Sequence, residues 1–102
     1  MVRLPKNRPP VHPGEILREE FLEPLGLTQR DLADRIDVSY QRVNELVNGK
    51  RGVTADTALR LARAFGTSPD VWINLQVRVD LWEAEHSRGS REIEKIRPFA
   101  HA

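Results

Sequence analysis

Two short amphipathic segments joined by a tight turn constrain this chain of 102 residues more than any other feature. The first covers residues 29–36, and Thr28 before it is a good N-terminal cap. Its apolar positions keep to one side of a helix: Leu32, Ala33 and Ile36. The second follows the cap Ser39 and ends at Asn48-Gly49, residues that tolerate the left-handed conformation of a helix end. Its apolar residues repeat at i, i+3, i+4: Val43, Leu46 and Val47.

This arrangement, over about residues 28–48, is the sequence pattern of a helix-turn-helix. Ala33 is informative because a small residue there lets the two helices approach closely. The polar side of the second helix suits the major groove of DNA, where Gln pairs with adenine, Arg with guanine and Glu with cytosine. The predicted DNA-binding residues are Gln29, Ser39, Tyr40, Gln41, Arg42, Asn44, Glu45, Asn48, Lys50 and Arg51.

The predicted contacts divide between bases and the DNA backbone. The N-terminal end of the second helix normally enters the groove, so residues 39–42 and Glu45 are the expected base readers, pointing outward from the helix. Gln29 is expected to lie against a phosphate. Residues expected to hold the backbone beyond the recognition helix are Asn48, Lys50 and Arg51. A polar helix side alone usually faces only water. Here the helix caps, the turn and a basic loop at 50–52 occur together at the spacing of a helix-turn-helix, which favours DNA binding.

Helical spacing continues outside this unit, and we expect an all-α fold of five helices without strands or internal repeats. One helix is predicted over 13–24, ended by Pro24 and Gly26. Another follows the cap Thr54 and is closed by Gly66, and the last runs over 69–86. We therefore expect a flexible basic arm at 1–12, one domain at 13–86, and a charged tail at 87–102.

The predicted helix at 69–86 is apolar on more than one side, so it needs more than one partner surface. We expect it to pack on its own domain and also to supply a dimer contact. The candidate dimer residues are Leu75, Val79 and Trp82, which follow one stripe. Val77 and Leu81 lie partly on another side of the same helix. Two copies would place recognition helices in successive major grooves about 34 Å apart, which predicts a palindromic operator.

Charge is unevenly distributed, although the formal net charge is only +1. Basic residues exceed acidic ones at 38–54, whereas the first and last predicted helices of the domain are acidic. A basic face turned to DNA and acidic faces elsewhere fit this pattern. The acidic side of the first helix suits a basic protein partner, although such runs are usually just solvated: Glu15, Glu19, Glu20 and Glu23. The arm at 1–12 could instead touch DNA or that partner.

Composition gives little support for catalysis. The chain has no cysteine, its three histidines are far apart, and no glycine-rich phosphate loop is present. No catalytic residue, metal or cofactor is therefore expected. No apolar run approaches the roughly 20 residues of a membrane helix, and the N-terminus lacks the apolar stretch of a secretory signal. These features favour a cytoplasmic location.

The stretch LTQRDLADRIDVSYQRVNELVNGKR at 27–51 resembles the DNA-binding unit of the Xre/Cro/phage-repressor family, which implies a lambda-repressor-like domain. The flanking PGEIL at 13–17 and WINLQVRVDLW at 72–82 resemble the HigA (VapI-like) antitoxins, and the likeness covers about residues 10–84. Tyr40 departs from the small or polar residue often found in the family, so a thymine methyl group or a phosphate is its expected contact.

The resemblance implies a dimer that represses its own operon and neutralises a HigB-type toxin, a small ribosome-dependent enzyme that cleaves mRNA. Two alternatives stay open. The chain could be a stand-alone transcriptional regulator without a toxin partner. It could also be a protein-interaction module whose helix-turn-helix does not bind DNA.

Overall fold

The computed structural model describes residues 8–100, and all the regular structure in that range is helical. The elements are α1 (Pro13–Ile16), η1 (Leu17–Leu22), α2 (Glu23–Leu25), α3 (Gln29–Ile36), α4 (Tyr40–Val47), α5 (Ala55–Phe65), α6 (Pro69–Glu85) and α7 (Ser90–Glu94). The expected all-α class is confirmed. Most of the predicted arm at 1–12 lies outside the described residues.

The elements α1, η1 and α2 follow one another without a break and form the predicted first helix. Its middle is a π turn, in which the N–H of Glu23 bonds to the carbonyl of Arg18, five residues earlier. The prediction that Pro24 ends this helix is wrong, because the helix continues to Leu25. It ends at Gly26, which takes the left-handed φ of 65° that favours glycine.

The four helices α3, α4, α5 and α6 begin where the sequence predicts, because each has a hydroxyl cap. The side chains of Thr28, Ser39, Thr54 and Ser68 each accept a hydrogen bond from a backbone N–H of the first turn. At Thr28 the exchange is mutual, since Asp31 accepts the Thr28 N–H at 2.9 Å. A cap of this kind contributes about 1 kcal/mol, so these boundaries are set locally.

The hydrophobic core centres on Trp72 of α6, which has no exposed surface. Its ring lies 5.3 Å from that of Phe21 and 6.5 Å from that of Phe65, between centroids. Its indole Nε1 donates to the hydroxyl of Thr67 at 2.9 Å, so its only polar atom is satisfied. The aromatic cluster therefore joins the first helix, the end of α5 and the start of α6.

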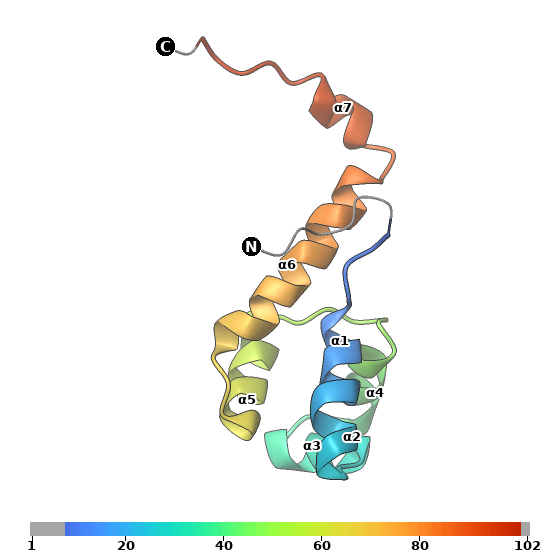
Figure 1. Cartoon of the computed structure of the whole chain (residues 1–102), viewed down its shortest axis with the longest axis vertical. Coiled ribbons are helices and arrows are strands. Elements are labelled where there is room, and N and C mark those ends of the chain that lie inside the picture. Colours follow the sequence, from blue (N-terminus) through green and yellow to red (C-terminus); the bar gives the residue numbers. More distant parts are fainter. Residues whose placement is uncertain (1–7, 101–102) are drawn as a thin grey trace.

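Figure 1 shows how the elements surround this core. The first helix packs on α4, α3 packs on α4, and α5 packs on the first half of α6. The second half of α6 leads away from the domain toward α7 and the C-terminus (Figure 1). The short helix α7 lies in the predicted charged tail, where the sequence pattern had not indicated a helix.

Candidate nucleic-acid interface

The turn between α3 and α4 is tight and is held from outside. Asp37 has a φ of 58°, in the left-handed region that residues other than glycine seldom adopt. The N–H of Val38 bonds back to the carbonyl of Ala33 at 3.0 Å. Arg60 of α5 donates from Nη1 to the Ile36 carbonyl at 2.7 Å and reaches the Asp37 carbonyl at 3.4 Å. The predicted tight turn between the two helices is confirmed, and a third helix stabilises it.

The N-terminal end of α4, the recognition helix, presents exposed polar side chains. Ser39 accepts the backbone N–H of Arg42 at 3.1 Å and so caps the helix. Tyr40 and Gln41 are exposed beside it. The guanidinium carbon of Arg30, a residue of α3 absent from the predicted set, lies 4.9 Å from the centroid of the Tyr40 ring. No local sequence signal links residues ten positions apart on two different helices.

Three amide side chains link the two helices of the unit. Asn44 of α4 donates to the Oε1 atom of Gln29 in α3 at 2.9 Å. Asn48 in turn donates to Asn44 at 3.2 Å. The Gln29 amide nitrogen takes no part in this chain of bonds. All three predicted contact residues are therefore brought together along one edge of α4.

Glu45 and Arg51, predicted respectively as a base reader and a backbone contact, are paired with each other. The Nε and Nη2 atoms of Arg51 lie 3.1 and 2.8 Å from the same Glu45 oxygen. This pairing lowers the pKa of Glu45 from its ordinary value. It also ties the basic loop, with the exposed Lys50, to the recognition helix. The other end of the loop is fixed to α6, because Val53 N–H donates to Gln76 at 2.8 Å.

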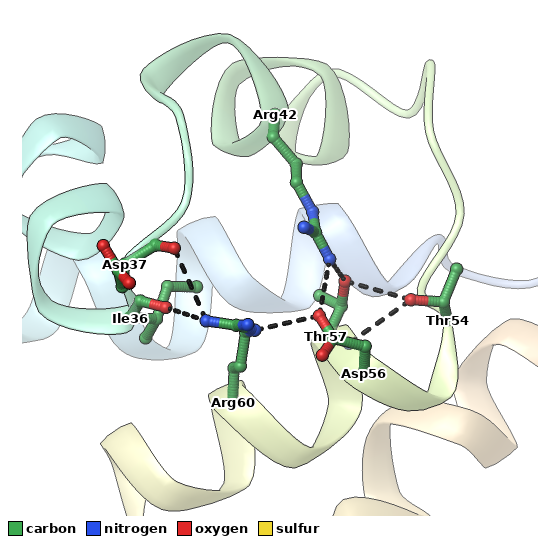
Figure 2. Close-up of polar contacts among 7 residues, drawn as sticks. All are labelled: Ile36, Asp37, Arg42, Thr54, Asp56, Thr57 and Arg60. Atoms are coloured by element: carbon green, nitrogen blue, oxygen red, sulfur yellow. Dashed lines mark hydrogen bonds and ion pairs between the residues drawn. The ribbon is translucent and has the colours of Figure 1, made fainter.

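Arg42 turns inward, contrary to the expectation that it points away from the domain (Figure 2). Its Nη2 atom lies 3.0 Å from the Asp56 carboxylate and 2.7 Å from the hydroxyl of Thr57. Asp56 also accepts from Nε of Arg60 at 2.8 Å. The hydrogen bonds from Arg60 and then from Arg42 lower the pKa of Asp56. Sequence reasoning missed this cluster because its members come from different helices.

The predicted dimer stripe on α6 faces largely toward its own domain. Val79 is only 8% exposed, and Leu75 packs against the core. Trp82 is half-buried and stacks on the ring of His86, with centroids 4.0 Å apart. The exposed apolar residues of this part of α6 are Val77, 44% exposed, and Leu81, 58% exposed. Periodicity showed two apolar sides but carried no information on which one the core covers.

Besides the paired carboxylates of Glu45 and Asp56, the groups gathered around α4 are amides, hydroxyls and guanidinium ions, which can bind phosphate oxygens and base edges. Within residues 8–100, no three acidic or histidine side chains are grouped so that they could hold a metal ion. In the same range, no helix combines the length and the apolar character needed to cross a membrane.

Comparisons with known proteins agree with a helix-turn-helix domain. A model of the helix-turn-helix family matches residues 18–72. Virulence-associated protein I of Dichelobacter nodosus is 52% identical over 85 residues, which cover 83% of this chain and 79% of that protein. Antitoxin HigA-1 of Vibrio cholerae is 44% identical over 94 residues, covering 91% and 87% of the two chains. The structure of the Pseudomonas aeruginosa antitoxin HigA with the higBA promoter is similar, with a TM-score of 0.83 and 42% identity, covering 89% of this chain and 99% of that one.

Proposed function

Because the chain belongs to the helix-turn-helix family and, within it, to the HigA antitoxins, we propose that it represses transcription by binding operator DNA and neutralises a partner toxin. The observation that carries DNA binding is the exposed N-terminal end of α4, where Tyr40 and Gln41 are exposed and Arg30 lies over the Tyr40 ring. The chain acts by binding and not by catalysis, and it acts in the cytoplasm, where its operator lies.

Base reading is assigned to the N-terminal end of the recognition helix. Gln41 is exposed and carries the paired donor and acceptor that match adenine. Tyr40 offers its ring to a thymine methyl group or its hydroxyl to a phosphate. Ser39 adjoins them as the helix cap. The residues proposed for the DNA backbone are Gln29, Asn44, Asn48, Lys50 and Arg51, with Arg30 added from the structure.

A second copy of the chain is proposed to pack on the exposed apolar side of α6. Val77 and Leu81 are one turn apart on that helix, and both lose contact with water when a partner covers them. This pair replaces the buried Val79 as the centre of the proposed interface. A dimer doubles the number of phosphate contacts, which matters for a chain with a net charge of only +1. It also requires a palindromic operator with half-sites about 34 Å apart.

The partner toxin is proposed to be a HigB-type enzyme that cleaves mRNA, since the similar proteins include a named HigA antitoxin. A protein that binds RNA is expected to be basic. The first helix presents an exposed acidic side that suits such a partner: Glu15, Glu19, Glu20 and Glu23. A stand-alone regulator without a toxin is the competing function.

DNA binding is tested by fluorescence anisotropy with the promoter fragment upstream of the gene and a shuffled fragment of equal length. We expect tight binding to the promoter alone. Gln41→Ala should weaken binding and relax preference at one base pair, whereas Lys50→Ala should weaken binding to both fragments and reduce its salt dependence. Equal binding to both fragments by the unaltered chain would contradict the proposed repressor function.

The dimer is tested by sedimentation equilibrium of Leu81→Asp. The matched control is Leu59→Asp on α5, since the two leucines are 58% and 61% exposed. We expect Leu81→Asp to sediment as a monomer and to lose operator affinity, and the control to stay dimeric. If Leu81→Asp and Leu59→Asp have the same oligomeric mass in solution, the α6 interface is contradicted.

The toxin partner is tested by co-expression with the adjacent small reading frame. Expression of that frame alone should stop growth, and the present chain should restore it. Repression of the promoter without any rescue of growth would favour the stand-alone regulator.

A further inference from the structure

We propose that Asp56 and Thr57 of α5 hold Arg42 as a clamp that sets the position of the recognition helix on DNA. Arg42 is then a positioning residue and not a base reader. This inference rests on the proposed operator binding, and it changes which side chains are expected to determine sequence preference.

One turn of α5 holds both helices of the helix-turn-helix, as Figure 2 shows. Asp56 and Thr57, at the start of α5, bind Arg42, near the start of α4. Arg60, one turn later, binds the carbonyl of Ile36 at the end of α3. The end of one helix and the beginning of the next are therefore fixed to the same rigid segment.

A single carboxylate oxygen connects the two contacts. The Oδ2 atom of Asp56 accepts from Arg42 at 3.0 Å and from Arg60 at 2.8 Å. Removal of Asp56 therefore loosens both helices, whereas removal of Arg42 loosens only α4. Because both arginines share one acceptor oxygen, their contributions are coupled through Asp56 and are not expected to be independent.

The contact between Arg42 and Thr57 holds the Arg42 side chain at its buried end, although the side chain itself is still 28% exposed. Its partner Thr57 is only 5% exposed, and the Thr57 hydroxyl also lies 3.2 Å from that of Thr54. If Arg42 moved out to a base edge, a buried hydroxyl would lose a 2.7 Å hydrogen bond and Asp56 would lose an ion pair. A contact with guanine must first offset both losses. Gln41, which is exposed beside it, can reach a base without breaking this cluster.

The experiment is a double-mutant cycle on operator affinity with Arg42→Ala, Asp56→Ala and the double variant. Each variant is also measured on a panel in which every base pair of the operator is changed in turn. We expect each single substitution to weaken binding by roughly three- to thirtyfold on every sequence in the panel. The order of preference among base pairs should stay unchanged, and the double variant should bind no more weakly than the weaker single variant.

Three further variants separate a clamp from a general loss of folding. Arg42→Lys keeps the charge but has a single donor nitrogen in place of the guanidinium fork, so it should recover part of the affinity. Arg63→Ala, at an exposed position of α5, should bind as tightly as the unaltered chain. If Asp56→Ala fails to fold by circular dichroism, Asp56→Asn replaces it in the cycle. The amide removes the charge of both ion pairs and leaves a neutral acceptor, so the expected loss of affinity is smaller but still present on every sequence.

The inference is overturned if Arg42→Ala removes discrimination at one base pair while an Asp56 variant binds normally, because Arg42 would then read a base. Independent, additive losses for the two residues would overturn it as well. A failure of the unaltered chain to bind its promoter is a different result, since it overturns the proposed function itself.

Discussion

The backbone of Gly14 lies directly against the carbonyl group of Leu46, so the first helix touches the end of the recognition helix without an intervening side chain. A Cβ atom at position 14 would overlap the Leu46 oxygen and lie 3.1 Å from the Cα atom of Val47. The glycine in the PGEIL segment is therefore a packing requirement. It allows α1 to support the C-terminal end of α4.

We predict that Gly14→Ala destabilises the fold, because backbone on both sides must move to admit one methyl group. Overpacking of this kind costs about 1–3 kcal/mol. Denaturant unfolding followed by circular dichroism measures the loss. The matched control is Gly89→Ala, since Gly89 has a φ of −74° and the nearest atom to its Cβ position is 3.8 Å away. An equal effect in both variants would contradict the packing argument.

His12 should make stability depend on pH. Its Nδ1 atom accepts the Gly14 N–H at 2.9 Å and caps α1, a bond that a protonated Nδ1 cannot accept. Burial lowers the pKa of His12 below its ordinary value of 6.5, against the opposing pull of Glu83, Asp80 and Glu15. Since the folded pKa is the lower one, this contribution is complete above pH 6.5 and declines as the pH falls below it.

The measurement compares the unfolding free energy of the natural chain with that of His12→Asn at about pH 7.5 and about pH 5.5. Asparagine caps a helix without titrating in this range. We expect the natural chain to lose stability over this interval and the variant to lose less. Parallel losses in the two proteins would rule out His12 as the cause.

Gln76 should hold the basic loop before α5 in position. It accepts the Val53 N–H at 2.8 Å and donates to Asp80 at 2.9 Å, so α6 and the loop are joined through one amide. Gln76→Leu leaves that buried N–H without its acceptor, which costs about 1–3 kcal/mol. We expect faster hydrogen exchange at the Val53 amide and weaker DNA binding on all sequences. Asp80→Asn, which keeps an acceptor for Gln76, should show neither effect.

Tyr40 should contribute to operator affinity through its ring and not through its hydroxyl group. The Arg30 guanidinium lies over that ring, so Tyr40→Phe keeps the support while Tyr40→Ala removes it. We expect the phenylalanine variant to bind the operator within about twofold of the natural chain, and the alanine variant to bind several-fold more weakly, in line with about 0.5–1 kcal/mol for an exposed cation–π pair. Anisotropy titrations measure both. A large loss in Tyr40→Phe would instead assign the role to the hydroxyl group.

Local signals were sufficient to predict where α3, α4, α5 and α6 begin. Thr28, Ser39, Thr54 and Ser68 cap backbone groups within three residues of themselves, so the helix starts can be read from short windows of sequence. The apolar spacing of α3 and α4 was similarly local, and it identified the helix-turn-helix. The π turn was missed because its cause is not visible in the apolar pattern of the first helix.

The directions of the polar side chains could not be predicted in this way. Arg42 and Asp56 are fourteen residues apart, and Gln76 and Val53 are twenty-three apart, so their pairing depends on how the helices pack. The same holds for α6, where Val79 is covered by the domain and Leu81 is not. Residue type identified candidates for DNA contact, but only the packed structure could show that Arg42 turns inward.

The π turn in the first helix has a consequence for comparing chains of different length. It accommodates one residue more than a regular helical turn would, and it does so without unwinding the helix, with Leu17 and Leu22 both buried five positions apart. Loss of a single codon between them would convert the π turn to a regular turn and bring those two leucines to the usual spacing of four. An alignment gap inside this helix would then mark the loss of the π turn, with the residues on either side still facing the core.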